Sequence, residues 1–105
     1  MKWTDVHRAF LVVEIERMVK PNEPEHGVEW ACRILSRREP WASLVKTQER
    51  GAKFDVSEVL RQHFYAARDA AGVKRLVQIL REFYTAQVDA DTVGQWDDLV
   101  ASVKK

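Results

Sequence analysis

The fold of this chain is predicted most directly by the stretch VKRLVQILREFY at residues 73–84. Its apolar side chains recur every three or four residues, which is the spacing of one face of an α-helix. The apolar set is Val73, Leu76, Val77, Leu80, Phe83 and Tyr84, and the polar set is Lys74, Arg75, Gln78, Arg81 and Glu82. We therefore expect an amphipathic helix that buries its apolar face.

Outward from this stretch, the rest of the chain has the same helical spacing. Glycine is scarce, proline is confined to positions 21, 24 and 40, and no segment alternates between apolar and polar residues as a strand does. Further helices are predicted over residues 4–19, 25–38, 41–50, 57–72 and 92–103. The predicted N-terminal caps are Thr4, Ser57 and, for the last helix, Asp91 or Thr92. The predicted fold class is all-α, a single compact domain of about six short helices in an irregular bundle.

Length and composition limit the class of protein. The 105 residues, 46% hydrophobic and 31% charged, match one helical domain over residues 1–105 and are too few for a two-domain enzyme. The longest apolar run, residues 9–13, falls short of the ~18 residues of a membrane span, and charged residues at positions 5 and 8 disfavour a signal peptide. The single cysteine, Cys32, cannot form a disulfide within the chain, which is typical of a reducing compartment. We expect a cytoplasmic protein that does not enter membranes.

The near-neutral total charge of +1 hides an uneven distribution. Residues 33–53 carry six bases and two acids, whereas residues 1–32 and 85–105 are each net negative by two. The six bases form a candidate surface for nucleic-acid phosphates: Arg33, Arg37, Arg38, Lys46, Arg50 and Lys53. Trp41 lies among them and could stack on an unpaired base. The alternative is that these bases are only the solvated faces of two helices, because the pI of 7.9 is low for a nucleic-acid-binding domain.

A helix-turn-helix over residues 57–84 is a second possible route to nucleic acid. The two predicted helices meet at Gly72, and the second presents basic side chains that could enter a groove. Against this, Arg68 stands where the first helix needs a small residue, and Gln78 stands where the second needs an apolar one. A plain helical hairpin explains the pattern better.

The sequence supports no catalytic, cofactor-binding or metal-binding residue. His7, His26 and His63 are scattered, and the one Glu-x-x-His spacing, from Glu23 to His26, contains a proline and has no second copy. Residues 89–94 begin like a calcium loop, but valines occupy the fifth and twelfth positions of that motif. We therefore expect no enzyme and no cofactor.

Other polar groups have simpler interpretations. Neighbouring carboxylates such as Glu14 and Glu16 point to different sides of a helix, so they are predicted to be solubilising residues. Cys32 is expected to be a packed thiol, and His63 is expected to lie at the boundary of the core.

Four tryptophans are an unusually high number for a chain of this length, and large aromatic side chains anchor both cores and binding surfaces. Trp96 belongs to an apolar stripe and is predicted to be core. The candidate interface aromatics are Trp3, Trp30, Trp41 and Tyr65. Ile79 also lies beside its helix's main stripe, so either additional neighbours bury it or it belongs to a docking face.

The function predicted from these patterns is that of a non-catalytic helical binding protein. It would act through a protein partner or self-association, as an adaptor, an inhibitor or a small subunit of a larger assembly. The alternative is binding to the nucleic-acid backbone through the basic middle of the chain.

Overall fold

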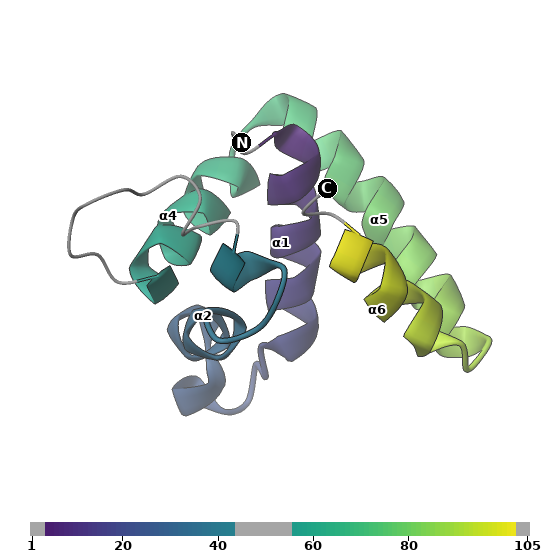
Figure 1. Cartoon of the computed structure of the whole chain (residues 1–105), viewed down its shortest axis with the longest axis horizontal. Helices are drawn as coiled ribbons and strands as arrows, with labels where there is room; N and C mark the ends of the chain where they lie inside the picture. The colour runs from purple at the N-terminus through teal and green to yellow at the C-terminus, as the bar shows by residue number, and fades with distance from the viewer. Residues whose placement is uncertain (1–3, 44–55, 103–105) are drawn as a thin grey trace.

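The computed structural model describes residues 4–43 and 56–102 and shows an all-α fold, as predicted (Figure 1). No strand occurs within these ranges. The helices are α1 (Asp5–Met18), the short 3-10 helix η1 (Pro24–His26), α2 (Val28–Leu35), α4 (Val56–Arg68), α5 (Ala71–Asp89) and α6 (Val93–Ala101). Residues 41–43 are also helical, and the rest of the helix predicted over 41–50 lies outside the described residues.

The caps of the helices agree only in part with the predictions. Thr4 caps α1, as predicted: its hydroxyl accepts a hydrogen bond from the His7 backbone N–H, and its own backbone N–H donates to His7 Nδ1 at 2.9 Å. The prediction for Ser57 is wrong, because α4 already includes Val56 and places Ser57 inside its first turn. Thr92 is the N-cap residue of α6, but its hydroxyl donates to Gln87 instead of accepting from α6.

The centre of the fold is α1, which packs against α2, α4 and α5 (Figure 1). Seven consecutive residues of this helix, 9–15, are buried, so this middle part is buried around its circumference and not along one stripe only. Helical spacing predicts that Val6 lies on one line with Phe10 and Val13, but Val6 is 48% exposed because it lies in the first turn, before the buried part of the helix.

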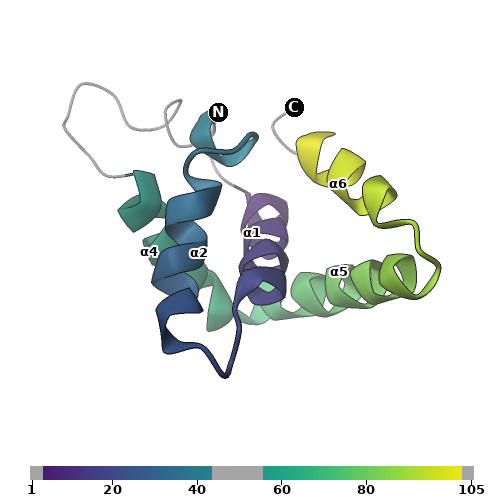
Figure 2. The same cartoon turned by 90° about the horizontal axis from the view of Figure 1, so that it is seen from below.

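The last two helices form a hairpin on one side of α1. Figure 2 shows α5 running below α1, and α6 turning back from the far end of α5. The turn between α5 and α6 contains Asp91 with φ of 57°, a left-handed conformation that aspartate adopts more readily than most residues. The predicted break at residues 89–92 is thereby confirmed.

The described helices enclose one apolar core. Its buried residues come from α1, α2, α4, α5 and α6, and Trp41 joins them. The Cα radius of gyration, 13.5 Å, is close to the value of about 13 Å for a compact chain of this length. Among the residues the structure describes, no helix combines the length and the apolar character needed to cross a membrane.

Candidate functional site

An open apolar hollow of about 460 Å³ lies between α1 and α5 and reaches α2 and α4. We call it the apolar hollow. Most of the side chains that line it are hydrophobic, and charged groups come from Glu16, Arg17 and Arg81. The lining residues are Val13, Ile15, Glu16, Arg17, Val19, Pro21, Val28, Phe64, Arg81, Tyr84 and Thr85. Hollows of this size and character accept small apolar ligands or the side chains of a docked segment.

A second hollow of about 380 Å³ lies beside the N-terminal half of α5. We call it the basic hollow, because three of its side chains are cationic and one is anionic. It is lined by Val12, Glu16, Ala67, Arg68, Lys74, Val77, Gln78 and Arg81. Arg68 also lies 3.8 Å from the carboxylate of Asp69, and its guanidinium lies over the Tyr65 ring, 5.2 Å from the ring centroid. Within the described ranges, no ion pair holds Lys74.

The two hollows adjoin each other along α1 and α5, because Glu16 and Arg81 line both of them. We call the whole feature the α1–α5 groove. On the α5 side it follows Lys74, Gln78, Arg81 and Thr85, which are successive neighbours on one helix face. With a rise of 1.5 Å per residue, this stripe is about 16 Å long, or three helical turns. The groove therefore has the length of a short helical segment.

The junction of the two hollows is an ion pair between the two helices. Arg81 donates to both carboxylate oxygens of Glu16, with Nε–Oε1 of 3.1 Å and Nη2–Oε2 of 2.7 Å. Both side chains are largely exposed, so this pair contributes about 0–1 kcal/mol to stability. Its main effect is to cancel one of the positive charges in the groove. The remaining cationic side chains of the basic hollow are Lys74 and Arg68, of which Arg68 lies 3.8 Å from the exposed carboxylate of Asp69.

The opposite flank of α1 contains a buried polar contact that sequence analysis missed. Glu14 was predicted to be a solubilising residue, but only 8% of it is exposed, which makes this prediction wrong. Its Oε1 accepts hydrogen bonds from Trp96 Nε1 at 2.5 Å and from Arg17 Nη1 at 3.1 Å. Helical spacing correctly places Glu14 and Glu16 on different sides of α1. It cannot predict the hydrogen-bond donor of Glu14, because Trp96 lies 82 residues further along the chain.

Arg17 connects this buried contact to the groove. Besides Glu14, it donates to Asp97 at 3.2 Å, and its guanidinium lies 5.0 Å from the centroid of the Tyr84 ring. Burial alone would lower the pKa of Arg17, but the surrounding Glu14, Tyr84 and Asp97 raise it above its ordinary value. Arg17 therefore carries a positive charge beside the groove, and contacts with Glu14, Asp97 and Tyr84 hold its side chain in place.

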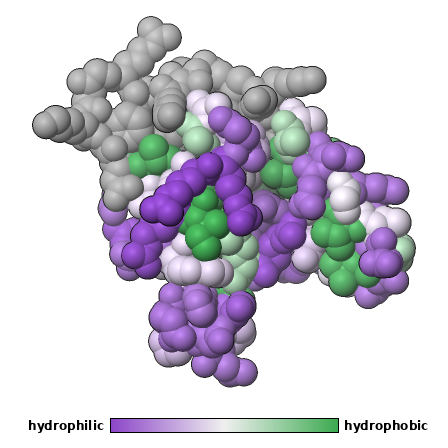
Figure 3. Space-filling view, turned by 60° about the horizontal axis from the view of Figure 1, so that its bottom comes forward, coloured by the Kyte–Doolittle hydropathy of each residue, from purple (hydrophilic) through white to green (hydrophobic). Residues whose placement is uncertain are grey.

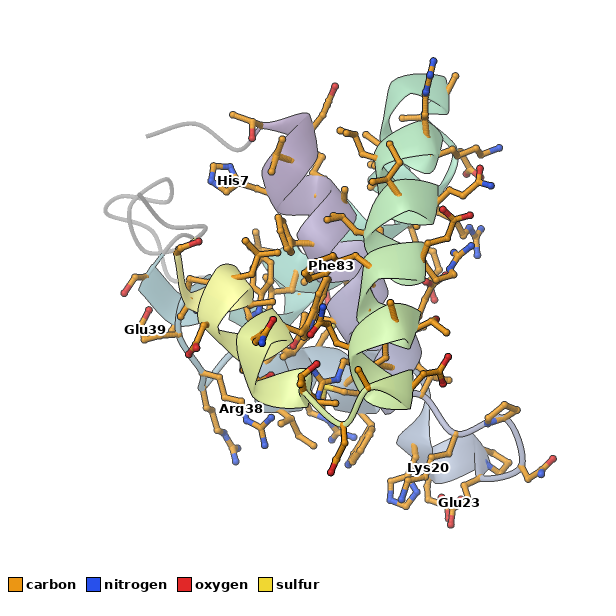
Figure 4. The ribbon with its side chains drawn as sticks, turned by 90° about the vertical axis from the view of Figure 1, so that its right-hand side faces the viewer. His7, Lys20, Glu23, Arg38, Glu39 and Phe83 are labelled. Carbon is orange, nitrogen blue, oxygen red and sulfur yellow. The ribbon has the colours of Figure 1, made fainter. Side chains whose placement is uncertain are left out.

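Hydrophobic side chains remain exposed on α5 and α6. Ile79 is 54% exposed and Phe83, one turn further along α5, is 39% exposed. Figure 4 shows Phe83 on the side of α5 that faces α6, and its ring centroid lies 6.3 Å from that of Trp96. Hydrophobic surface also emerges in separate patches between hydrophilic residues on the face seen in Figure 3. The sequence did not decide whether Ile79 is buried by additional neighbours or belongs to a docking face. In the structure, no described residue covers it.

The candidate interface aromatics have different surroundings in the structure. Tyr65 is 43% exposed, whereas Trp30 is partly buried, packed on the core and in edge contact with His26. The prediction for Trp41 is wrong, because its side chain is 1% exposed and belongs to the core, so its ring is not available for stacking on a base. Trp3 lies outside the described residues.

The candidate basic surface is described only in part. Arg33, Arg37 and Arg38 are exposed on α2 and the turn after it, and Figure 4 shows Arg38 projecting outward. No ion pair to these three side chains is formed by the part of the chain that the structure describes. The other three predicted residues, Lys46, Arg50 and Lys53, lie outside that part.

One group of possible metal ligands occurs among the described residues. Glu23, Glu25 and His26 bring one ligand atom each within 4.8 Å of one another, at η1. However, Glu23 already accepts from His26 Nδ1 at 3.0 Å and lies 3.6 Å from the Lys20 ammonium, and Figure 4 shows Lys20 and Glu23 in the same lobe. The hydrogen bond from His26 lowers the pKa of Glu23. The carboxylate thus has two cationic or donor partners from the chain itself.

The surroundings of Cys32 and His63 shift the pKa values of both side chains. Cys32 is buried, as predicted, and burial raises the pKa of its thiol to about 11, which leaves it protonated at neutral pH. His63 is partly buried, also as predicted, and lines a third hollow with Asp5 and Arg8. Burial, and to a smaller extent the charge of Arg8, lowers the pKa of His63.

Comparison with known proteins finds no match: no protein-family model, no curated protein and no solved structure is similar to this chain. The candidate site is therefore argued from its geometry alone.

Proposed function

We propose that this protein is a non-catalytic helical module that binds a segment of a protein partner in the α1–α5 groove. It would act in the cytoplasm as an adaptor, an inhibitor or a small subunit of a larger assembly. The observation that carries this proposal is the apolar hollow, an open space of about 460 Å³ with a hydrophobic lining. Helical proteins commonly bind partner segments in such grooves between two helices, where apolar anchors of the segment enter the hollow.

Two features of the groove support docking of a segment over binding of a small molecule. The apolar hollow is open to the surface, and the stripe on α5 that borders the two hollows together extends for about three turns. Charged side chains stand at its border, with Arg17 and Arg81 beside Val19 and Thr85. A hydrophobic centre with a polar border is the usual composition of a protein–protein interface.

The test is a selection of ligands followed by a matched pair of variants. A displayed library of random peptides of about 16 residues would be selected on the full chain, and the affinity of the recovered peptides measured by fluorescence anisotropy. Thr85→Trp adds a large side chain at the exposed border of the apolar hollow. Ala86→Trp adds the same side chain one residue further along, at an exposed position that does not line the groove.

We expect Thr85→Trp to weaken binding by about 10-fold or more, equivalent to about 1.4 kcal/mol, and Ala86→Trp to change it by less than about 2-fold. The proposal fails if no recovered peptide is sensitive to Thr85→Trp. It also fails if the two variants weaken binding equally, because the groove would then have no special part in it.

The second candidate function is binding to the nucleic-acid backbone. It is favoured by Arg33, Arg37 and Arg38, three exposed arginines within six positions of the chain. The loss of Trp41 as a stacking residue weakens it. This candidate predicts that a fluorescent single-stranded RNA binds at about 50 mM salt, that binding falls steeply by about 200 mM, and that Arg37→Glu/Arg38→Glu abolishes it. Absence of binding at the lower salt concentration would eliminate it.

A further inference from the structure

The charge of the α1–α5 groove changes along its length, and this gradient specifies the partner. At the Thr85 end the lining is mostly hydrophobic, with Val19, Val28 and Phe64, and the positive charge of Arg17 is taken up there by ion pairs with Glu14 and Asp97. At the Lys74 end the lining includes Arg68 and Lys74, neither of which is used by the ion pair at the junction. A segment that fills the whole groove must therefore satisfy an apolar end and a cationic end.

We propose that the partner segment is an amphipathic helix with apolar side chains at one end and acidic side chains at the other, the latter facing Arg68 and Lys74. The proposal rests on the proposed function and adds the chemistry and the spacing of the ligand. Electrostatic complementarity of this kind sets the specificity and the orientation of a docked segment.

The spacing follows from the geometry of α5. Tyr84 and Thr85 border the apolar hollow, and Lys74 and Gln78 border the basic hollow, so the two ends are about 10–15 Å apart along the helix. A partner helix that lies along the groove covers this distance in two to three turns. Its carboxylates should therefore stand about 7–11 residues from its main apolar anchor.

The cationic end favours carboxylates because of what surrounds its charges. Glu16 is the only anionic side chain among the residues that line the basic hollow, and both of its oxygens are taken up by Arg81. Lys74 is exposed on α5, and Arg68 is exposed at the C-terminal end of α4. Two exposed charges at one end of the groove attract acidic residues over a distance limited by salt, about 8 Å at physiological ionic strength.

The composition of the selected peptides gives the first test. Peptides that depend on the apolar hollow are those whose binding is lost in Thr85→Trp. We expect this subset to be enriched in Asp and Glu about 7–11 positions from its most hydrophobic residue, compared with peptides that bind equally well to Thr85→Trp. If hollow-dependent peptides are recovered without this enrichment, the inference about acidic residues is wrong and the proposed function stands. If no hollow-dependent peptide is recovered, the proposed function itself is wrong.

A charge-reversal pair gives the second test, with one recovered acidic peptide as the probe. Arg68→Glu/Lys74→Glu should weaken binding by about 10-fold or more and remove most of its dependence on salt between about 50 mM and 500 mM. The matched control is Arg61→Glu/Arg75→Glu, which makes the same change in net charge at positions outside both hollows. Replacing the acidic residues of the peptide with Gln should produce the same loss on the unmodified protein. Equal effects of both double variants would show a non-specific charge effect and overturn the inference.

The same experiments would give different results if the groove bound a second copy of this chain or a nucleic acid. A concentration-dependent dimer in light scattering that disappears in Thr85→Trp would assign the groove to a second copy of this chain and overturn the proposal. Displacement of the acidic peptide by single-stranded RNA, with loss in Arg68→Glu/Lys74→Glu, would assign the basic hollow to a polyanion and also overturn it.

Discussion

The two flanks of α1 differ in how completely they are closed. On the flank toward α6, Trp96 covers the helix: its ring lies 5.4 Å from the rings of both Phe10 and Tyr84, and its N–H donates to Glu14. On the flank along the groove, no helix in the described ranges covers Glu16, which is held only by Arg81 at the surface. Trp96 of α6 thus closes one flank of α1. The other flank, at Glu16, remains available to a ligand.

The largest effect should come from removing that side chain. Trp96 is fully buried, so Trp96→Ala should lower the free energy of unfolding by about 3–5 kcal/mol, through lost burial and the cavity left behind. Urea denaturation followed by circular dichroism measures this, with Ile79→Ala at an exposed position as the control, expected within about 0.5 kcal/mol of the original protein. A loss below about 1 kcal/mol for Trp96→Ala would show that α6 does not close this flank.

Thiol labelling compares the interior with the groove directly. Cys32 is buried with a pKa of about 11, so at pH 8 a disulfide reagent should react with it at least about 100-fold more slowly than with an exposed thiol. Thr85→Cys places such an exposed thiol at the groove in the same molecule. We expect two labelling phases, of which the slow one becomes fast in denaturant. Two equally fast phases in the native protein would contradict a closed interior.

A smaller effect distinguishes the two carboxylates of α1. Glu14→Ala should cost about 1–3 kcal/mol, because it leaves the buried donor of Trp96 without its acceptor, whereas Glu16→Ala should cost no more than about 1 kcal/mol. Trp96→Phe keeps a ring but removes the donor, so a double-mutant cycle of Glu14→Ala with Trp96→Phe isolates the hydrogen bond. The comparison fails if the two alanine variants are equally stable.

These carboxylates also show where sequence analysis reaches its limit. The all-α class, the cap at Thr4 and the break before α6 follow from local spacing and were predicted correctly. The burial of Glu14 depends on a donor 82 residues away, and the burial of Trp41 depends on how the segment after α2 packs onto the core. Neither is a property of the local pattern. The groove could not be predicted for the same reason, because it forms only where four helices meet.

The smallest expected effect is on the loss of stability at acidic pH. The lowered pKa of His63 means that the unfolded chain binds a proton more readily than the folded one. The stability that comes from keeping His63 neutral is complete above about pH 6.5 and is lost as the pH falls through the unfolded and then the folded pKa. His63→Gln should therefore flatten the decline in unfolding free energy between about pH 7 and pH 5, measured by urea denaturation at each pH. An unchanged slope would show that another group controls this decline.

The contact between Glu14 and Trp96 also orders events while the chain is being made. At about 5–20 residues per second, the 82 residues between them take roughly 4–16 s to synthesise. Until Trp96 has been made, Phe10 lacks its ring contact and the Glu14 carboxylate lacks the Trp96 donor. The first of the described helices is therefore completed by the last of them, and the contacts of its enclosed residues with Trp96 form only after α6 has been made.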